Sequence, residues 1–416
     1  MGDPMAILRP FRALRPRPDE ASRVAALPYD VVTVDEARAQ AGDNALSFLR
    51  VSRPELELAP GTDPYGEEVY ERAIQNFARL KAQAFVLEDE PSAYLYRLRH
   101  GAHEQTGLAA CFSIDDYDRS VIKKHERTRR DKEDDRTRHM IALGAQTGPV
   151  FLVYRAAAGI DEVVTRATAT RPLFDFDAVD GVRHTIWRVG QPDAGLLVTE
   201  FARIPSLYIA DGHHRAASAA RARRQLGDRV VTRGAGGDAA DPSTFLSVAF
   251  PHNQVRILPY NRIVKDLGGV DVRAFLRAVG ERFEMKSGRA APDRPGEIAM
   301  YVDGAWTALR PRVHIDQSNS DRIKALDVSI LQNELLQPVL GIVDVTTDKR
   351  IDFIGARGGT SELERLVDSG TAAVAFSLHA VTIADLMAVS DTGAIMPPKS
   401  TWFEPKLRDG LLIHLI

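Results

Sequence analysis

Hydrophobic residues recur along this chain with two different periods, which together predict helices interleaved with strand pairs. Over 63–83, Tyr70 and Phe77 fall on one stripe at helical spacing. Asp63 can cap this helix, and Pro64 suits its first position. We therefore predict a helix over 63–83.

The same periodicity predicts further helices. Their ranges are 193–203, 211–227, 268–285 and 326–342. Asp327 can cap the last of them, with Leu331 and Leu335 facing inward. The segment 121–148 mixes charges of both signs, which is typical of a solvated helix.

Runs with a period of two predict strands, several of them paired as hairpins. Asp-Gly lies between two such runs within 174–189 and again within 297–310, which is a strong hairpin signal. Gly101 separates two further runs, at 92–100 and 105–115. Continuous apolar runs predict buried strands at 149–154, 206–210 and 244–250. Hairpins mixed with helices indicate an α+β or mixed α/β fold.

The other segments predict irregular structure. Residues 24–33 should be a strand end followed by a turn at Pro28, and the Gly-, Ala- and Asp-rich stretch 232–243 a loop. The segment 394–416 should be a proline-punctuated loop that leads to a terminal apolar strand. The length of 416 residues allows two or three domains. We divide the chain into regions 1–155, 156–265 and 266–416.

Composition narrows the possible partners. The net charge is −3, with 54 basic and 57 acidic residues, so the sequence has no electrostatic footprint for nucleic-acid binding. Cys111 is the single cysteine, which excludes a disulfide framework and a cysteine-based metal cage. It lies in an apolar run, which favours a buried inert thiol over a nucleophile. No apolar stretch approaches the ~20 residues of a membrane helix, and we expect a cytoplasmic protein without membrane partners.

The sequence YIADGHHRAASAARARRQLG at 208–227 places Gly212 between an apolar strand and an alanine-rich helix. Such a junction exposes unpaired N–H groups and the positive end of the helix dipole, which together bind anions. Gly212 allows close approach of a ligand, and Arg215 can direct two donors at phosphate oxygens. His213 and His214 add donors that can be charged near neutral pH.

The alternative is that Asp211 simply caps the helix. Capping does not require two histidines and an arginine in the first turn, where positive charge opposes the dipole. We therefore favour phosphate binding by Asp211, Gly212, His213, His214 and Arg215. A zinc site is the weaker alternative, because adjacent histidines point in different directions and the helical His-x-x-x-His spacing is missing.

The chain resembles a known family through five strings in order. They are LRPFRALRP, PYDV, KKHERT, IADGHHRAASA and MPPKSTWFEPKLRDGL, within residues 6–416. Together they look like domain-of-unknown-function family 1015, within the ParB/sulfiredoxin-like superfamily. The resemblance implies a nucleotide-binding core with additional hairpin and helix elements. Superfamily relatives include free-serine kinases that use ATP or ADP. One departure is Asn261, where a histidine is expected after ILP.

The resemblance also implies a phosphoryl transferase, and phosphoryl transfer requires positioning, charge neutralisation and a carboxylate base. Glu126 in KKHERT is the candidate base, with His213, His214 and Arg215 as further catalytic residues; the alternative for Glu126 is a surface charge run. Candidate substrate contacts are His125, Arg127, Thr128, Tyr29 and Asp30. Candidate contacts to phosphate or carboxylate are Lys399, Ser400 and Thr401. For PYDV and PPKST, plain turn formation is the alternative.

Mg²⁺ usually neutralises phosphate charge in such transfers, and Asp211 is the candidate ligand, directly or through water.

The leading hypothesis is a kinase acting on free L-serine or a similar small hydroxyl compound. A nucleotide-binding regulator is disfavoured by the missing helix-turn-helix pattern. A sulfiredoxin-like reductase would need a reactive cysteine in the loop. A nucleotide hydrolase stays open, as do the phosphate donor, the acceptor and the oligomeric state, for which a homodimer is one option.

Overall fold

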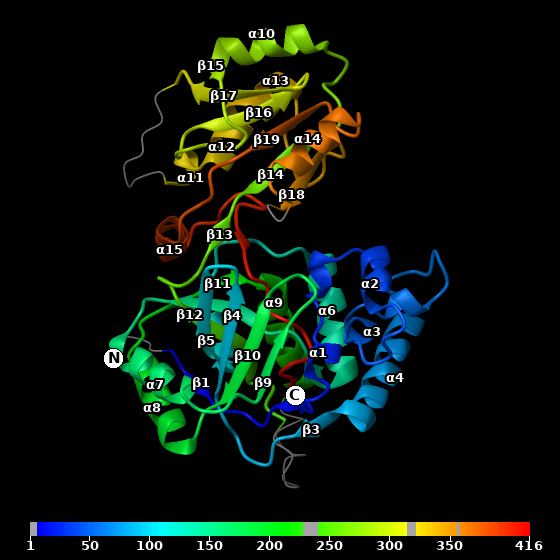
Figure 1. Ribbon diagram of the computed structural model, residues 1–416, viewed down its shortest axis with the longest axis vertical. Helices are drawn as coiled ribbons and strands as arrows, with labels where there is room; N and C mark the ends of the chain where they lie inside the picture. The colour runs from blue at the N-terminus through cyan, green and yellow to red at the C-terminus, as the bar shows by residue number, and fades with distance from the viewer. Residues whose placement is uncertain (1–5, 228–239, 314–321, 356–357) are drawn as a thin grey trace. The chain divides into compact units, whose positions relative to one another are not determined.

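A computed structural model describes residues 6–227, 240–313, 322–355 and 358–416 (Figure 1). The chain forms two compact units, one of residues 1–255 with 405–416 and one of residues 256–404. The division of the sequence into three regions stays a prediction. Within the described residues, no helix combines the length and hydrophobicity that crossing a membrane requires.

The first unit is built on a mixed sheet of nine strands, in the order β6-β11-β8-β12-β5-β4-β10-β9, with β1 also paired to β5. The pairs β11–β6 and β12–β8 are parallel and the other pairs are antiparallel. The strands are β1 Leu8–Arg9, β4 Tyr94–His100, β5 His103–Ser113, β6 Ile122–Lys123, β8 Val150–Tyr154, β9 Phe174–Asp177, β10 Arg183–Arg188, β11 Leu207–Asp211 and β12 Thr244–Pro251. The fold is therefore mixed α/β with a central mixed sheet.

Helices and two small strand pairs complete this unit. The helices are α1 Ala21–Val24, α2 Val34–Ala41, α3 Leu49–Ser52, α4 Glu67–Ala84, α5 Ile114–Asp118, α6 Arg130–Leu143, α7 Ala158–Thr168, α8 Gln191–Phe201 and α9 His213–Leu226, with 3₁₀ turns η1 Tyr29–Val31 and η2 Pro54–Glu57. The small pairs join β2 Leu14–Pro16 to β3 Phe85–Leu87, and β7 Ala145–Gln146 to β21 His414–Leu415. The C-terminal segment thus returns to the first unit.

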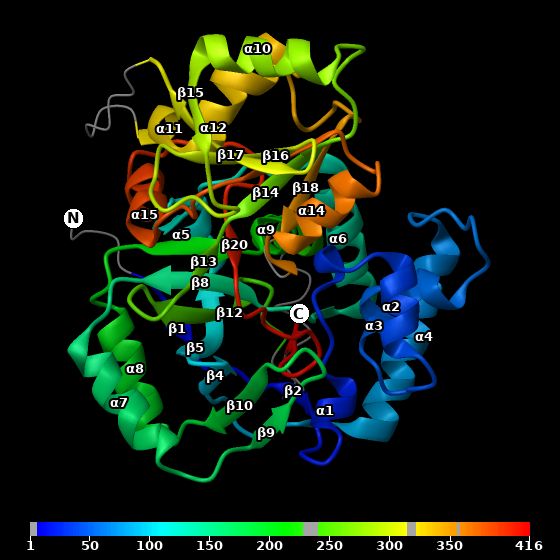
Figure 2. The same cartoon turned by 45° about the horizontal axis from the view of Figure 1, so that its top comes forward.

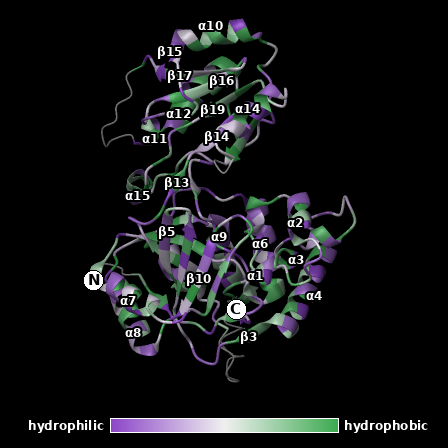
Figure 3. Ribbon diagram, in the orientation of Figure 1, coloured by the Kyte–Doolittle hydropathy of each residue, from purple (hydrophilic) through white to green (hydrophobic). Residues whose placement is uncertain are grey.

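One hydrophobic cluster joins the sheet to α7, α8 and α9. It contains Leu152 of the sheet, Ile160, Leu197 and the small side chain of Ala216. The helices α7 and α8 lie side by side (Figures 1 and 2). Figure 3 shows hydrophobic and hydrophilic residues side by side on α4 and α7, as expected for helices with one buried face.

The second unit contains an antiparallel sheet in the order β15-β17-β16-β19-β14-β18. Its strands are β14 Tyr260–Val264, β15 Phe283–Ser287, β16 Ile298–Val302, β17 Ala305–Pro311, β18 Ile351–Gly355 and β19 Val374–Ser377, with β13 Ile257–Leu258 paired separately to β20 Trp402–Phe403. Its helices are α10 Val272–Arg282, α11 Arg322–Ala325, α12 Asp327–Leu331, a π-helical turn Gln332–Leu336, α13 Gln337–Leu340, α14 Ser361–Asp368 and α15 Ile383–Asp391. Met300 packs in the cluster that includes α10, whereas its neighbour Tyr301 packs in the cluster that includes α14, so helices cover both faces of this sheet.

The predicted hairpins and buried strands are confirmed by β4–β5, β9–β10, β16–β17, β8, β11 and β12. Cys111 is buried, and burial raises the pKa of its thiol, as expected for an inert residue. Leu331 and Leu335 face inward as predicted. The loop predicted over 232–243 lies largely outside the described residues.

Four local predictions differ from the structure, in whole or in part. The helix expected from Asp63 begins at Glu67 after Gly66, because the Asp63 carboxylate instead accepts a hydrogen bond from the Tyr65 amide and forms a turn. Asp327 does not cap α12, since its carboxylate accepts from the amides of Gly296 (2.7 Å) and His379 (3.2 Å).

In the stretch 24–33, the predicted turn at Pro28 is confirmed as the 3₁₀ turn η1. The predicted strand is reduced to an isolated bridge between Ala26 and Asp409, since α1 ends at Val24. The charged segment 121–148 is not a fully solvated helix. It contains β6 and α6, and α6 packs against α9 with Asp135 and His139 buried.

Candidate functional site

The DGHHR motif forms the junction between β11 and α9. Asp211 is the last residue of β11, and Gly212 is the N-cap of α9 with φ of +95°. A Cβ atom on Gly212 would lie 3.3 Å from both the Arg215 Cζ and the Val150 Cα, so both conformation and space require glycine. Asp211 does not cap the helix, which corrects the alternative considered from the sequence.

His213 contacts the KKHERT segment, and His214 contacts Arg129, the residue that follows it. The His213 Nε2 accepts a hydrogen bond from the His125 amide at 3.4 Å, and the two imidazole rings meet edge to face with centroids 4.5 Å apart. The His214 Nε2 accepts from the Arg129 amide at 3.0 Å. Because β6 runs parallel to β11, it delivers this segment to the start of α9. Two motifs 88 residues apart are thereby joined.

Burial makes His213 and His125 neutral near pH 7. It lowers the pKa of His213 well below its ordinary value, with the neighbouring His125 adding to the effect. Burial likewise lowers the pKa of His125 to about 4. The expectation that His213 carries charge near neutral pH is therefore wrong, because the pocket that positions it also removes it from water.

Glu126 lies beside His213 and is partly exposed, with 35% of its side chain accessible and its Oε2 at 3.9 Å from the His213 Nδ1. The possible ligand atoms of His125, Glu126 and His213 all lie within 4.8 Å of one another, which is close enough for a metal ion. However, the Nε2 of neutral His213 is an acceptor, so its proton is on Nδ1, facing Glu126. In that tautomer the His213 Nδ1 offers a proton to the Glu126 side and no lone pair to a metal.

Arg215 points into the unit. It is 9% exposed, and its Nη1 donates to the Pro149 carbonyl oxygen. Its Nη2 lies 3.7 Å from the Asp30 Oδ2 and 3.9 Å from the Asp211 Oδ2. Burial would lower the pKa of Arg215, but Asp30 and Asp211 outweigh it and raise the pKa. The guanidinium charge is thus already met by carboxylates.

Asp211 has a second cationic partner that sequence reasoning missed. Lys406 Nζ donates to the Asp211 Oδ2 at 3.1 Å. Burial would raise the pKa of Asp211, yet Lys406 and Arg215 together hold it below its usual range. Lys406 could have been noticed in the sequence, because it is a charged residue close to an apolar terminal run and lies inside the string MPPKSTWFEPKLRDGL.

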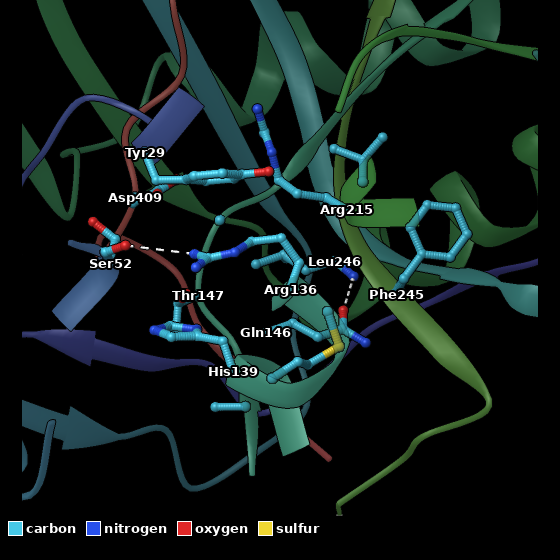
Figure 4. A pocket seen from close by; sticks show the side chains of 14 residues that line it. Tyr29, Ser52, Arg136, His139, Gln146, Thr147, Arg215, Phe245, Leu246 and Asp409 are labelled. Atoms are coloured by element: carbon cyan, nitrogen blue, oxygen red, sulfur yellow. Dashed lines mark hydrogen bonds between the residues drawn. The ribbon is translucent and has the colours of Figure 1, made fainter. Parts of the chain in front are cut away.

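A cavity of about 40 Å³ lies next to Arg215 (Figure 4). Tyr29, Arg136 and Asp409 line it with Arg215, and the Arg136 guanidinium lies 4.2 Å from the centre of the Tyr29 ring. Burial raises the pKa of Asp409 to about 7, while Arg215 opposes this and Asp30 adds to it. Sequence reasoning proposed Tyr29 and Asp30 but missed Arg136 and Asp409.

The remaining predicted residues have varied surroundings. Arg127 is exposed, and the Thr128 hydroxyl donates to the Glu133 carboxylate. Asn261, at the expected histidine position, is buried, and its Oδ1 accepts from the Leu378 amide at 3.2 Å. In the first unit, the structure brings together Tyr29, Asp30, His125, Glu126, Asp211, Gly212, His213, His214 and Arg215.

Lys399, Ser400 and Thr401 belong to the second unit. Lys399 has φ of +55°, and its carbonyl oxygen accepts from the Arg262 Nη2 at 3.0 Å. The Ser400 hydroxyl donates to the Pro397 carbonyl oxygen at 2.6 Å. These contacts fit the alternative of a turn, and a role for the three residues in ligand binding stays a prediction.

Comparison with known proteins identifies the family. The model of the family described as Protein of unknown function (DUF1015) matches residues 8–329, and the chain belongs to this family. No curated protein matches the chain.

Solved structures give only distant likenesses. A conserved hypothetical protein from Pyrococcus furiosus is 15% identical with a TM-score of 0.35, over 74% of this chain and 95% of that chain. A free serine kinase in complex with AMP is 13% identical with a TM-score of 0.36, over 73% and 91%. SbnI with a C-terminal truncation, from Staphylococcus aureus, is 11% identical with a TM-score of 0.39, over 72% and 85%.

Proposed function

We propose that this member of the DUF1015 family is a kinase that transfers a phosphoryl group from ATP or ADP to the hydroxyl of free L-serine or a similar small compound. The observation that carries the proposal is the pairing of Glu126 with His213 at the amino-terminal end of α9. A carboxylate 3.9 Å from an imidazole nitrogen thus lies beside a helix end that would bind an anion. We further propose that β6, β11 and α9 belong to a ParB/sulfiredoxin-like nucleotide-binding core.

The start of α9 would bind the nucleotide phosphates. The first N–H groups of a helix have no partner within the helix, and the helix dipole adds positive potential there. Gly212 presents no Cβ, so phosphate oxygens can approach the backbone closely. The imidazole of His214 is half-buried at this end of the helix and would supply a further contact to phosphate.

Glu126 would act as the general base. The acceptor oxygen forms a bond to the terminal phosphorus, the bond from that phosphorus to the bridging oxygen breaks, and the hydroxyl proton passes to Glu126. The His213 Nδ1, which is 3.9 Å from the Glu126 Oε2, would hold the carboxylate in place. A positioned base contributes about 10²–10⁴-fold to such a step.

The charges of this site favour a divalent cation that arrives with the nucleotide. Arg215 and Lys406 are already paired with Asp30 and Asp211, so few cationic side chains are left to match the phosphates. Mg²⁺ would neutralise phosphate charge when bound. We propose that Asp211 helps to hold it through water, because Lys406 already contacts its Oδ2.

The direct experiment is a phosphotransfer screen of ATP and ADP against the twenty amino acids, with the products identified by mass spectrometry. The proposal expects one phosphorylated amino acid and a matched loss of phosphate from the nucleotide. Nucleotide turnover that is independent of every amino acid would instead identify a hydrolase, which shares the phosphate site and uses water as the acceptor. An absence of nucleotide binding would overturn both functions.

A further inference from the structure

The cavity beside Arg215 contains polar groups whose bonding is incomplete. Arg215 Nε and Nη2 are buried and donate no hydrogen bond to any described residue. The Asp409 Oδ1 is buried and accepts none from the described part of the chain, although Asp409 is only 3% exposed. Burying such groups without partners costs stability, so a site that contains them is typically completed by a ligand or by water.

Two other polar side chains that line the cavity already have hydrogen-bond partners. Arg136 Nε donates to the Asp135 Oδ2 at 2.8 Å. The Gln146 amide donates to the Thr244 carbonyl oxygen at 3.0 Å and accepts from the Leu246 amide at 2.7 Å (Figure 4). These side chains therefore support the wall, and the unmatched groups are one guanidinium edge and one carboxylate oxygen.

The unmatched groups define the chemistry of a ligand. Nε and Nη2 form the edge of a guanidinium that binds a carboxylate through two parallel hydrogen bonds. The Asp409 Oδ1 needs a donor. An anion alone would accept hydrogen bonds from Arg215 but would leave the Asp409 Oδ1 without a donor. It would also meet the charges of Asp30 and Asp211, whose carboxylates lie 3.7 and 3.9 Å from the Arg215 Nη2. A cation alone would leave the Nε and Nη2 donors without a hydrogen bond.

Building on the proposed kinase activity, we propose that this cavity is the subsite for the α-carboxylate and α-ammonium groups of a free amino acid acceptor. Arg215 binds the carboxylate and Asp409 binds the ammonium. A zwitterion satisfies both groups without adding net charge to a buried site. An ammonium beside Asp409 would also favour its ionised form, offsetting the burial that raises its pKa to about 7.

The first turn of α9 connects the cavity to the proposed base. Arg215 and His213 both lie in the first turn of α9, and His213 contacts Glu126 while Arg215 lines the cavity. The subsite and the proposed base thus flank the same helical turn. Asp409 comes from the returning C-terminal segment, and its carboxylate lies against Gly148, where a Cβ would overlap the Asp409 Oδ1.

The test measures ligand binding to the full-length protein by calorimetry, and it does not depend on phosphoryl transfer. The probes are the amino acid found by the screen, or L-serine if the screen finds none, with ethanolamine and 3-hydroxypropionate as analogues that lack the carboxylate and the ammonium. We expect both analogues to bind at least about tenfold more weakly than L-serine, because each loses a charge-assisted contact.

The variants Arg215→Lys and Asp409→Asn test the carboxylate contact and the ammonium contact separately. Arg215→Lys should weaken L-serine binding about tenfold or more and leave ethanolamine binding unchanged. Asp409→Asn should weaken L-serine binding similarly and leave 3-hydroxypropionate binding unchanged. Matched controls are Arg166→Lys and Asp193→Asn, from a more exposed pair in the same unit, whose Nη2 to Oδ1 distance is 2.7 Å. They should leave binding unchanged.

The outcomes distinguish the subsite from the proposed function. Amino acid binding with the expected pattern but without phosphoryl transfer would support the subsite and refute the kinase. The subsite is refuted if no amino acid binds, if both variants affect every probe equally, or if Arg215→Lys weakens ADP binding and not L-serine binding, which would make Arg215 a phosphate contact. Thermal unfolding of each variant verifies that it is folded.

Discussion

At the scale of single residues, the electrostatics of the candidate site follow from two features. His213 is neutral, and the cationic side chains are already ion-paired. Burial makes His213 neutral, and its Nε2 accepts a backbone hydrogen bond, so its Nδ1 proton faces Glu126. Arg215 and Lys406 are compensated by carboxylates. At the proposed nucleotide site, a phosphate would therefore meet the helix end and its backbone donors more than side-chain cations.

Gly212→Ala tests the requirement for glycine at this helix end. Because φ is +95° and a Cβ would lie 3.3 Å from two other atoms, alanine should lower the free energy of unfolding by about 1–3 kcal/mol and weaken ADP binding. Gly190→Ala is the matched control, since Gly190 is the N-cap of α8 with φ of −65° and has no atom within 4 Å of a Cβ. Urea unfolding and ADP titration measure both effects, and equal results for the two variants would contradict the account.

Removal of divalent metal ions tests whether the side chains of the site alone can neutralise the charge of the nucleotide phosphates. If the nucleotide brings charge that the paired side chains do not match, EDTA should abolish phosphoryl transfer and added Mg²⁺ should restore it. The activity assay in chelator, with Mg²⁺ titrated back, measures this. Full turnover in EDTA would show that the side chains of the site suffice.

At the scale of elements, the sequence patterns correctly predicted those helices and hairpins that are determined by neighbouring residues. The hairpins β9–β10 and β16–β17 follow from Asp-Gly turns between alternating runs, and α9 follows from its alanines and a terminal glycine. Details that depend on distant partners did not follow. Asp327 has the composition of a helix cap, but the Gly296 and His379 amides, which are remote in sequence, take its oxygens.

Prediction of the candidate site was limited in the same way, because its residues come from segments that are distant in sequence. The sequence offered DGHHR, KKHERT and PYDV as separate motifs. The pairing of β6 with β11 brings KKHERT to DGHHR, and the approach of Asp30 to Arg215 brings PYDV to it. The partners Lys406 and Asp409 arrive on a segment that returns to the first unit after the whole of the second unit has been formed. No local period encodes such a return, which is why these two residues were missed.

Lys406→Met tests this connection between β11 and the C-terminal segment. Lys406 is 5% exposed, and its removal leaves Asp211 without its 3.1 Å partner. We expect a loss of about 3 kcal/mol, at the low end for a broken buried ion pair because Asp211 keeps some solvent contact. The double variant with Asp211→Asn should recover much of this loss in urea unfolding. A double variant whose loss equals the sum of the single losses would mean that the two residues are not coupled.

At the scale of the whole molecule, buried neutral histidines link stability to pH. His184 illustrates this, since burial, with Arg408 nearby, lowers its pKa to about 3 from the ordinary 6.5. Its Nε2 accepts from the Arg408 Nε at 3.2 Å, and its Nδ1 is 2.8 Å from the Tyr96 hydroxyl. His139 is also buried, with a pKa of about 4.

The sign follows from proton uptake on unfolding. The unfolded chain binds a proton at His184 below pH 6.5 whereas the folded chain does not, so stability is full above pH 6.5 and falls as the pH decreases toward 3. Between pH 6.5 and 5, His184→Gln should reduce this decline by about 2 kcal/mol. Amide hydrogen exchange in β4 and β10 measures the free energy of unfolding at both pH values. If the variant showed the same dependence of stability on pH as the natural chain, the burial of neutral His184 would be contradicted.

Kinetics of the Glu126→Gln variant test whether Glu126 is the base of a phosphoryl transfer. The variant keeps the shape of a side chain whose carboxylate faces the His213 Nδ1 at 3.9 Å and removes its basicity. With the acceptor from the screen, the account predicts a kcat at least ~10²-fold lower and an ADP affinity close to that of the natural chain. Turnover at the unaltered rate would contradict it, and a loss of nucleotide affinity as large as the loss in kcat would place Glu126 in the nucleotide site instead.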